Sequence, residues 1–409
     1  MPAHTHCRIC QQKLPGPVLD LGSMPLANSF LTSPVEFDGE SSYPLAVAAC
    51  PGCGLAQLTY TVPAEQLYRE YIYVSSTSEA VRLHGDHLAA DLSSRYGWGS
   101  SDLLVEVASN DGTVLKAFQK RGLQVLGVEP ARNVAAMAQA AGVPTELDFF
   151  TDESAAALSA RVGSAAGILA RHVFAHVDDL DDFLRGVLRL LRDNGIFVIE
   201  VPYFGTLVDN LEFDTVYHEH LSYFALQPLE HLFAKHGLIV VDVEPVSLHG
   251  GSIILHIGRD TMHASTERVC QMREHEEARQ LTDISTLVRF AERVRRWKEG
   301  FEAFVTDLVH GQARLIGYGA AAKANTLLNY SPLVARSLHC ILDRSSLKHG
   351  RYTPGTHVPV AAADTWGEHD ATHMLILAWN FQKEIIHQME PFARRGGRFV
   401  VPIPEPRLV

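Results

Sequence analysis

The middle of the chain alternates buried strand patterns with helical patterns. Apolar runs typical of strands occur at DLLVEVA (102–108), QVLGVEP (124–130), GILARHV (167–173) and GIFVIEVP (195–202). Helical patterns fill the intervals, at residues 112–121, 131–141 and 179–192. Such alternation is typical of a parallel sheet with helices on both faces. Residues 226–258 add a helix and the runs LIVVDVEPV and GGSIILHIG, which predict a terminal antiparallel hairpin.

The two ends of the chain have different patterns. Residues 1 to about 75 are rich in Pro, Gly and Cys, and their short apolar runs predict small strands between turns. Residues 266 to about 312 are charged and helical, as in a connector, and a second strand–loop–helix begins at ARLIGYGAAAKANTLLN (313–329). We predict an α/β protein in three parts, with a small N-terminal module at residues 1–75 and two larger Rossmann-like α/β parts at 76–260 and 261–409.

Composition and charge restrict the classes of partner. The chain has 409 residues and a net charge of −12, which argues against DNA as the main partner, because phosphate backbones are bound through clustered Lys and Arg. No apolar run reaches the ~18 residues that a membrane span needs, and the N-terminus MPAHTHCRIC lacks the pattern of a signal peptide. We therefore expect a cytoplasmic protein that binds neither nucleic acid nor membranes.

Four of the six cysteines form two C-x-x-C pairs, Cys7 with Cys10 and Cys50 with Cys53. Two such pairs supply the thiolates of a tetrahedral zinc site, each pair chelating from a tight turn. With no further ligand position evident, we predict a structural site. The alternatives are buried free thiols and a redox C-x-x-C, and the absence of a helix pattern after either pair disfavours the redox reading.

The segment LLVEVASNDGTVL (103–115) is a buried strand that ends in a loop of small residues and opens a helix. Small residues let a cofactor approach the backbone, and a helix N-terminus favours carboxylate or phosphate. Glu129, at the end of the next strand, lies where an acid accepts both ribose hydroxyls. Asp148 and Phe149 of ELDFF suit an adenine amino group and ring. This order of features matches the S-adenosylmethionine (SAM) site of class I methyltransferases.

One departure from the usual cofactor motif is Ala108, which stands where E/D-x-G-x-x-x-G has its first glycine. Taken alone, the loop fits an ordinary strand–turn–helix equally well. The succession of Glu106, the loop and Glu129 favours SAM. The predicted cofactor-binding residues are Glu106, Ala108, Asn110, Asp111, Gly112, Glu129, Pro130, Asp148, Phe149 and His172.

Histidines follow two of the central strands. In ARHVFAHVDDLDDFL (170–184), His172 and His176 come directly after a strand, at the carboxyl edge where open α/β sheets bind ligands. For either one alone, a capping or core role is the alternative. The segment DTVYHEHLSYFA (214–225) follows the strand that ends at Pro202, again at the carboxyl edge, so we expect it to lie over the cofactor.

The segment 214–225 combines groups that suit acid/base chemistry. Imidazole is a base near neutral pH, a neighbouring carboxylate fixes its tautomer, and a phenol hydrogen-bonds a developing enolate. We interpret the cluster as acid/base machinery. One alternative is a second zinc site, which the absence of an H-E-x-x-H spacing disfavours. The other alternative is structural packing.

Two further segments carry candidate substrate-binding residues. YREYIYVSSTSE (68–79) supplies tyrosines and small hydroxyl residues in a linker that we expect to form a lid. IGYGAAAKANTLLN (316–329) is a strand–loop–helix with Gly317 and Gly319 in its turn, and Lys323 in the first turn of the helix suits a diphosphate. The full P-loop motif is absent, and an ordinary turn is the alternative.

In this order, the segments resemble the SAM-dependent nucleotide-sugar C-methyltransferases of deoxysugar biosynthesis, the group that contains the C-3'-methyltransferase of D-tetronitrose formation. The likeness covers almost the whole chain and includes the paired C-x-x-C, Y-x-Y…SS, E-x-x-x-NDG, G-x-EP, DFF, YHEH, HGGS and YGA-x-AK…PG-x-x-x-PV…AWN. The resemblance implies a monomer with an N-terminal zinc-binding module, a central class I methyltransferase domain and a C-terminal nucleotide-sugar-binding α/β domain.

The resemblance also implies roles for individual residues. It makes His220 the base, supported by Glu219, with Tyr217, His176 and the lid residue Tyr71 in the catalytic set. Lys323 and its neighbours hold the nucleotide diphosphate. The predicted substrate-binding residues are Tyr73, Ser76, Ser78, Tyr203, His249, Gly250, Gly251, Tyr318, Lys323, Asn325, Trp379 and Asn380.

The expected reaction is methyl transfer from SAM to a carbon of a nucleotide-linked 4-keto deoxysugar, carried by dTDP or a similar nucleotide. We expect His220 to remove the proton from C-3, next to the ketone, and the resulting enolate to attack the methyl group. One alternative is transfer to a non-sugar carbon acid or to a hydroxyl group. The other is a nucleotide-sugar sensor without catalysis, which the YHEH cluster disfavours.

Overall fold

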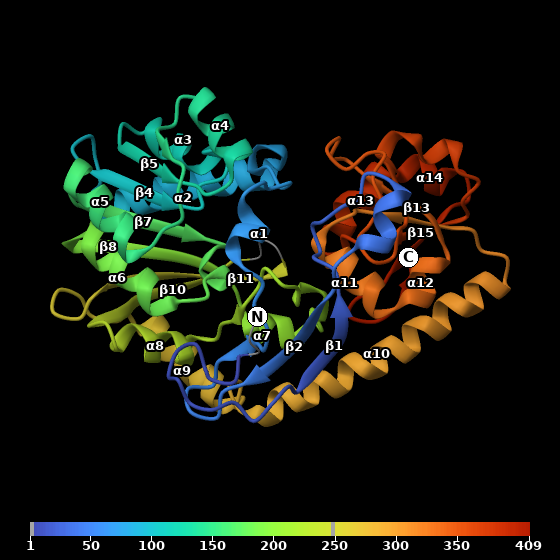
Figure 1. Cartoon of the computed structure of the whole chain (residues 1–409), viewed down its shortest axis with the longest axis horizontal. Coiled ribbons are helices and arrows are strands. Elements are labelled where there is room, and N and C mark those ends of the chain that lie inside the picture. Colours follow the sequence, from blue (N-terminus) through green and yellow to red (C-terminus); the bar gives the residue numbers. More distant parts are fainter. Residues whose placement is uncertain (1–3, 247–249) are drawn as a thin grey trace.

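Three β-sheets divide the chain, as shown by the computed structural model of Figure 1, which describes residues 4–246 and 250–409. A small antiparallel sheet lies in the N-terminal part, a seven-stranded sheet in the middle part and a six-stranded sheet in the C-terminal part. The predicted fold class, α/β with a small N-terminal module and two Rossmann-like parts, is confirmed.

The N-terminal sheet has the strand order β1-β2-β3-β9. Its strands are β1 (Leu19–Met24), β2 (Tyr43–Ala49), β3 (Ala56–Leu58) and β9 (Ser222–Tyr223). The short helical elements of this part are η1 (Pro34–Gly39), α1 (Ala64–Tyr68) and η2 (Ser75–Thr77). Strand β9 belongs to the middle of the chain and pairs with β3 through Tyr223 and Ser222. The histidine-rich segment is thereby attached to the N-terminal sheet.

The central sheet has the order β10-β11-β8-β7-β4-β5-β6. Its strands are β4 (Leu103–Val107), β5 (Gln124–Val128), β6 (Thr145–Glu146), β7 (Ala165–Arg171), β8 (Leu191–Pro202), β10 (Leu238–Val246) and β11 (Ser252–Arg259). Pairing is parallel from β6 to β8, and β11 is antiparallel to both of its neighbours. The predicted terminal hairpin is therefore present, with β11 inserted between β8 and β10.

Helices cover both faces of the central sheet because its strands are buried on both sides. They are α2 (Glu79–Tyr96), α3 (Thr113–Gln119), α4 (Arg132–Ala140), α5 (Asp152–Val162), α6 (Leu180–Leu190), α7 (Phe204–Asp209) and α8 (Leu226–Ala234). On one face α2 and α3 pack with Val198, and on the other α5 and α6 pack with Phe197. Two 3-10 turns, η3 (Phe174–His176) and η4 (Phe213–Thr215), lie near the carboxyl edge.

Two helices, α9 (Glu267–Ala278) and α10 (Ile284–His310), connect the middle part to the C-terminal part. In Figure 1, α10 runs beneath β1 and the C-terminal part. Its buried side chains recur every three or four residues, as expected for one face of a helix, and include Phe290, Val294, Trp297 and Phe301. The Trp297 indole N–H donates to the carbonyl of Pro402 at 2.8 Å, which fixes the helix to the C-terminal part.

The C-terminal sheet has the order β14-β13-β12-β15-β16-β17. Its strands are β12 (Leu315–Tyr318), β13 (Leu338–Asp343), β14 (Val360–Ala362), β15 (His373–Ile376), β16 (Arg398–Val401) and β17 (Arg407–Leu408). The helical elements are α11 (Ala322–Tyr330), α12 (Pro332–Arg336), η6 (Ala363–Glu368), η7 (Trp379–Phe381), α13 (Gln382–Gln388) and α14 (Glu390–Arg394). All strands except β17 pair in parallel.

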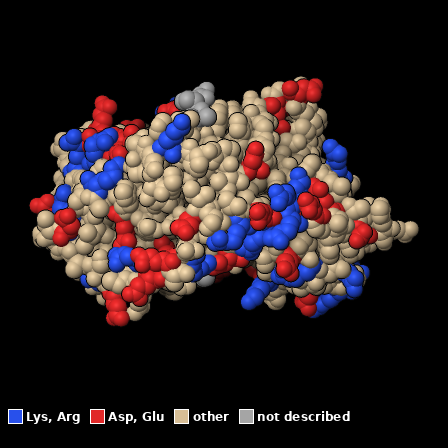
Figure 2. Space-filling view, turned by 90° about the horizontal axis from the view of Figure 1, so that it is seen from below, with Lys and Arg blue, Asp and Glu red and all other residues tan. Residues whose placement is uncertain are grey.

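The outer surface mixes charges of both signs. Figure 2 shows Lys and Arg side chains among Asp and Glu on the face seen from below. Exposed residues of α10 include Arg289, Glu292, Arg295 and Glu299. Within the described residues, no helix is long and apolar enough to cross a membrane.

Candidate functional site

The four cysteines of the two C-x-x-C pairs meet in one cluster. Their sulfur atoms all lie within 4.8 Å of one another, and Cys7, Cys50 and Cys53 are buried. The backbone N–H groups of Ile9 and Gly52 donate to the sulfurs of Cys7 and Cys50, each at 3.4 Å, so each pair sits in a tight turn that also supports thiolate charge. Four convergent thiols of this kind fit the donor set of a structural zinc ion.

The loop after β4 adopts a conformation that non-glycine residues rarely take. Ala108 has φ 54° and Asn110 has φ 53°, both in the left-handed region. Glu129, at the end of β5, holds this loop, because its carboxylate accepts the N–H of Asn110 at 2.7 Å and that of Ala131 at 2.9 Å. The backbone of the loop and the Glu129 carboxylate are thus fixed together where the cofactor was predicted.

Buried charges lie behind this loop. Arg171, at the end of β7, donates to Glu200 at 2.9 Å and lies 3.7 Å from Glu106. Burial raises the pKa of Glu106 to about 7, against the opposing effect of Arg171. Among the described residues, Glu106 Oε2 is buried and has no hydrogen-bond partner. This carboxylate oxygen is therefore available to accept a hydrogen bond from a bound ligand.

The segment predicted as a lid lies on the cofactor loop. Asn110 accepts the N–H of Ser75 at 2.9 Å and donates to the carbonyl of Tyr73 at 3.0 Å. Asp111 accepts the N–H of Ser76 at 3.0 Å. Ser78, predicted to bind substrate, caps helix α2, because its hydroxyl accepts the N–H of Val81. The hydroxyl hydrogen can still be donated, so substrate binding by Ser78 stays a prediction.

The remaining predicted cofactor residues occupy the same edge of the sheet. Phe149 follows β6 with the Arg69 guanidinium 4.7 Å from its ring centre, while Asp148 is exposed and accepts the Phe149 N–H. His172 follows β7 with φ 53°, and its Nε2 lies 3.3 Å from Glu200. Pro130 is half-buried directly after Glu129.

His220 lies at the centre of the histidine-rich segment with a defined tautomer. Its Nδ1 lies 2.8 Å from the carbonyl oxygen of Thr215, and a carbonyl only accepts, so Nδ1 carries the hydrogen and Nε2 has the free lone pair. Burial, followed by the neighbouring His176, holds the pKa of His220 well below its ordinary value. The ring is therefore neutral near pH 7 and able to accept a proton at Nε2.

Two aromatic rings contact His220. The ring centre of Tyr217 lies 4.0 Å away and that of His176 5.1 Å away. Tyr68, at the end of α1, stacks in turn on His176 at 5.7 Å. The sequence interpretation missed Tyr68, although it starts the YREYIYVSS segment, because its contact with His176 spans more than a hundred residues.

Glu219 has a different partner from the one predicted. Its two carboxylate oxygens accept from Asn28 at 2.6 Å and from the Tyr71 hydroxyl at 3.0 Å. The tautomer of His220 is set by the carbonyl of Thr215, not by Glu219, which corrects the prediction that the neighbouring carboxylate fixes it. Adjacent side chains point to different sides of the backbone, so Glu219 reaches the N-terminal module. Asn28 was missed because no local pattern links it to Glu219.

Tyr203 was also predicted to bind substrate, and this stays a prediction. Its buried ring lies beside Glu276 of α9, and burial followed by that carboxylate raises the pKa of the phenol. Glu276 in turn accepts the N–H of Leu226 at the start of α8. Tyr203 therefore lies close to the connector helix α9.

The HGGS segment is described only in part. The prediction for His249 lies outside the described residues. Gly250 and Gly251 have φ values of 102° and 125°, and a Cβ on Gly250 would lie 2.7 Å from Glu212 Oε2. The positive φ values favour glycine at both positions, and the backbone at Gly250 lies close to the Glu212 carboxylate.

Lys323 of α11 lies beside carboxylates of the middle part. Its Nζ is 3.8 Å from Glu212 and 5.1 Å from the ring centre of Trp379, and the Trp379 N–H donates to Asp214 at 2.6 Å. Burial raises the pKa of Glu212 to about 7 and that of Asp214 to about 6, while Lys323 opposes both shifts. Glu212 and Asp214 were missed because nothing in the sequence pairs them with the C-terminal part.

The other predicted residues of the C-terminal part surround α11. Asn325 donates to the carbonyl of Ala27 at 2.6 Å and lines a small hollow with Tyr217 and His218. The Tyr318 hydroxyl donates to Gln388 at 3.3 Å, so its ring packs toward α13. Asn380 is half-buried in η7, next to Trp379.

An acid at the end of β13 was missed. The carboxylate of Asp343 accepts the N–H groups of Ala320 and Ser345, each at 2.7 Å. Lys348 lies 3.5 Å from the same carboxylate and donates to the carbonyl of Ala320 at 2.7 Å. Glu129 was predicted because it is an acid at the end of the strand that follows a strand–loop–helix. Asp343 in SLHCILDRS has the same position in the C-terminal part.

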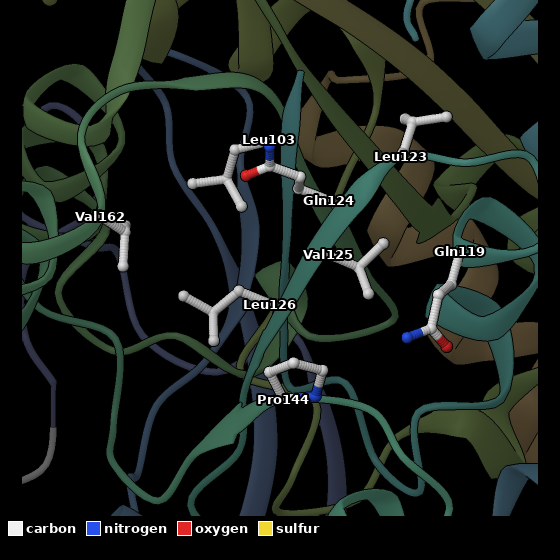
Figure 3. Close-up of a pocket in the computed structure, with 8 residues that line it drawn as sticks. All are labelled: Leu103, Gln119, Leu123, Gln124, Val125, Leu126, Pro144 and Val162. Carbon is white, nitrogen blue, oxygen red and sulfur yellow. The ribbon is translucent and has the colours of Figure 1, made fainter. Parts of the chain in front are cut away.

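A surface hollow of about 390 Å³ lies at the opposite edge of the central sheet (Figure 3). Leu103 and Gln124, at the starts of β4 and β5, line it together with Val125 and Pro144. Because the predicted site residues follow the carboxyl ends of the strands, this hollow is separate from them.

Family models cover the three parts of the chain. A "Putative zinc binding domain" matches residues 7–68, a "Methyltransferase domain" matches residues 84–243 and a "C-methyltransferase C-terminal domain" matches residues 247–404. The sheet order with an antiparallel strand inserted near one edge, and the acids around the loop after β4, define a SAM-dependent methyltransferase of class I.

The particular family follows from a full-length relative. The C-methyltransferase NovU of Streptomyces niveus is 36% identical over 404 residues, which cover 98% of this chain and 96% of NovU. The chain belongs to this C-methyltransferase family, as its sequence predicted.

Solved methyltransferase structures share a slighter likeness. The magnesium protoporphyrin IX methyltransferase ChlM of Synechocystis PCC 6803 with bound SAM is 11% identical, covering 44% of this chain and 79% of that chain, with a TM-score of 0.34. The mitomycin 7-O-methyltransferase MmcR is 17% identical, covering 45% and 55%, with a TM-score of 0.35. At these TM-scores the likeness carries no conclusion about this chain.

The residues around the first loop fit SAM, the cofactor of this family. SAM carries a sulfonium and an amino group, and the partnerless Glu106 Oε2 together with the Asp111 carboxylate offers acceptors for positive charge. Glu129 retains acceptor capacity for ribose hydroxyls beyond its two backbone contacts. The residues that would hold the cofactor are thus Glu106, Asp111 and Glu129.

Proposed function

We propose that this enzyme transfers a methyl group to a carbon next to the ketone of a nucleotide-linked 4-keto deoxysugar, with C-3 as the methylated carbon. The membership of a C-methyltransferase family supports transfer to carbon. The observation that carries the acid/base part of the proposal is the neutral His220 ring, whose Nδ1–H is held by Thr215. A carbon acid needs such a base, whereas binding alone does not.

In the proposed reaction His220 Nε2 takes the proton from the carbon next to the ketone, and the electrons of the C–H bond form an enolate. SAM supplies a methyl group that is already activated by positive sulfur, so the enolate carbon forms the new C–C bond as the S–C bond breaks. The half-buried phenol of Tyr217 beside His220 supports hydrogen bonding to the enolate oxygen. Proton transfer by a positioned group contributes about 10²–10⁴-fold in rate.

The C-terminal part is proposed to hold the nucleotide diphosphate of the substrate. Lys323 and Lys348 lie near the turn between β12 and α11, and cations at a helix start suit phosphate. Asp343 is proposed to accept ribose hydroxyls, as Glu129 does for the cofactor. The zinc cluster is proposed to support the N-terminal sheet without taking part in the chemistry, and the enzyme is proposed to act as a monomer.

Replacing His220 tests the proposed base. We expect His220→Asn to lower methyl transfer by about 10³-fold or more and to abolish deuterium exchange at the carbon next to the ketone, with SAM affinity unchanged. Labelled SAM, a panel of dTDP-linked 4-keto sugars and NMR of the product give these readouts. His231→Asn, an exposed change on α8, is the matched control.

If His220→Asn exchanges the proton at the normal rate, another residue is the base. If the wild-type enzyme methylates no keto sugar nucleotide but does methylate another carbon acid or a hydroxyl group, the substrate assignment is wrong. A protein that binds the nucleotide sugar and transfers no methyl group would be a sensor, which contradicts the proposal.

A further inference from the structure

His176 and His220 are carried by two separate loops. His176 ends the η3 turn after β7, and His220 follows η4. Their ring centres lie 5.1 Å apart with an angle of 27° between the planes. One backbone hydrogen bond joins the loops directly, from the N–H of Leu221 to the carbonyl of Ala175 at 2.8 Å.

The Arg8 side chain of the N-terminal module contacts both loops. Arg8 lies between two cysteines of the zinc cluster, and its side chain is 2% exposed. Its Nε donates to Asp178 at 3.1 Å, two residues after His176. Its Nη1 lies 3.4 Å from the carbonyl of Leu221, the residue after His220. The guanidinium therefore bridges the loops of the two histidines.

The same guanidinium is fixed firmly in its own module. Nη1 donates to the carbonyl of Leu58 at 2.8 Å, and Nη2 donates to the Thr61 hydroxyl at 2.6 Å. Strand β9, which begins directly after Leu221, pairs with β3 of that module. Because the guanidinium is planar and its donors have a fixed geometry, it transmits the position of the module to both loops.

We propose that Arg8 is a positioning residue that sets the spacing of the His176–His220 pair, so that the zinc-binding module orients the base. This inference rests on the proposed role of His220. Arg8 touches the loops and not the reacting atoms. A displacement of about 1 Å at a catalytic group lowers a rate by about 10²-fold, so small errors in this spacing have large effects.

A second link between the module and the middle part provides a matched control. Lys235 of α8 donates to the carbonyl of Ile9 at 2.7 Å and to Asp181 of α6 at 3.0 Å. Ile9 is the neighbour of Arg8, so Lys235 holds the same turn. Lys235 contacts neither histidine loop. Replacing Lys235 therefore weakens only the attachment of the module to the middle part. Replacing Arg8 weakens this attachment and also removes the contacts that hold the two histidine loops.

The test compares the variants Arg8→Gln, Arg8→Lys, Asp178→Asn and Lys235→Met in the full-length, zinc-loaded enzyme. We expect Arg8→Gln to lower kcat about 30- to 100-fold, with KM, SAM affinity and zinc content within about twofold of wild type. Asp178→Asn, which keeps an acceptor oxygen but removes the charge from one of the two loop contacts, is expected to lower kcat about fivefold to tenfold. Arg8→Lys keeps the charge without the bridge and is expected to recover little of kcat.

A second readout does not depend on activity. In protein labelled with ¹⁵N-histidine, we expect the His220 ring nitrogens to shift in Arg8→Gln and to stay at wild-type positions in Lys235→Met. A purely structural role of Arg8 would lower the melting temperature and leave these signals unchanged. If Arg8→Gln does not fold, Asp178→Asn decides, because it leaves every module contact of Arg8 in place.

Three results would overturn the inference: kcat of Arg8→Gln within about threefold of wild type, an equal loss of kcat in Lys235→Met, or loss of zinc in parallel with loss of kcat. If Arg8→Gln does not fold, the inference is overturned when Asp178→Asn leaves both kcat and the ¹⁵N signals of His220 unchanged. If the ¹⁵N shifts occur but the wild-type enzyme methylates no keto sugar, the proposed substrate fails and the positioning of His220 stands.

Discussion

The two α/β parts of this enzyme hold their first loops in the same way. After β4, the N–H of Ala108 donates to the carbonyl of Val128. The carboxylate of Glu129 accepts the N–H of Asn110 in the loop and the N–H of Ala131, two residues after Glu129. After β12, the N–H of Gly319 donates to the carbonyl of Leu342, and Asp343 makes the corresponding two contacts. The acid at the end of the second strand thus fixes the loop of the first strand in both cases.

The side chains around the two loops differ in sign. Glu106 and Asp111 accompany the first loop, where SAM brings positive charge. Lys323 and Lys348 accompany the second, where a diphosphate brings negative charge in the proposed function. The comparison teaches that the same backbone arrangement occurs in both parts, and that in the proposed function the charges around it select the ligand.

The strongest test of this comparison is to replace Glu129 and Asp343, one at a time. Glu129→Ala leaves two backbone N–H groups without their partner, and unpaired buried donors cost about 1–3 kcal/mol each, so we expect SAM to bind about 100-fold more weakly. Nucleotide-sugar affinity should stay within about threefold. Asp343→Ala should show the reverse pattern. Calorimetry with each ligand measures both, with Glu146→Ala, at a half-buried residue that pairs with Arg161, as the control.

If either acid variant weakens both ligands equally, the two sites are not separate and the comparison is wrong.

A smaller effect is expected from the charge at the second loop. Lys323→Met removes a cation that would bind phosphate, and a hydrogen bond to a charged group contributes about 1.5–3 kcal/mol, so nucleotide-sugar affinity should fall about tenfold or more. SAM affinity should not change. The matched control is Lys298→Met. Lys298 belongs to α10, and its Nζ lies 4.6 Å from the ring centre of Tyr330. Equal binding by Lys323→Met and wild type would place the diphosphate elsewhere.

The backbone of the two loops gives a third contrast. A Cβ on Gly319 would lie 2.6 Å from Cβ of Ala378 at φ 92°, so we expect Gly319→Ala to destabilise the C-terminal part by about 1–3 kcal/mol. Ala108 already has a side chain at φ 54°, and Ala108→Gly should change stability by less than about 1 kcal/mol. Thermal unfolding followed by calorimetry measures both. Equal unfolding temperatures for Gly319→Ala and wild type would show that the loop adapts.

The smallest expected effect is a pH dependence of opposite sign at the two sites. Burial raises the pKa of Glu106 and that of Glu212 to about 7. As pH rises from 6 to 7.5, Glu106 becomes negative beside the cationic cofactor, so SAM should bind about threefold more tightly. Glu212 becomes negative beside Lys323 and competes with the diphosphate, so the nucleotide sugar should bind about threefold more weakly.

The variants Glu106→Gln and Glu212→Gln should each flatten one of the two profiles. Calorimetry with a nucleotide sugar whose diphosphate does not titrate in this range separates the enzyme from the ligand. Slopes of the same sign at both sites would contradict the assignment of these carboxylates.

Much of the fold could be predicted from the sequence, because the patterns that indicate strands, helices and metal-binding turns are local. Alternating strands and helices gave the central sheet, two C-x-x-C pairs gave the cysteine cluster, and Glu129 was found as the acid that ends a strand. Asp343 carries the same signal and was overlooked. The roles of the individual catalytic residues stay predictions, because no ligand contact tests them.

The sequence by itself determined which groups are present: two histidines in YHEH, acids at strand ends, four thiols and a lysine at a helix start. Only the tertiary structure decided their partners. Asn28 holds Glu219 across 191 residues, and Arg8 reaches Asp178 across 170. Contacts between residues so far apart depend on how the three parts pack against one another. Local periodicity does not encode that packing, so no short stretch of sequence reveals it.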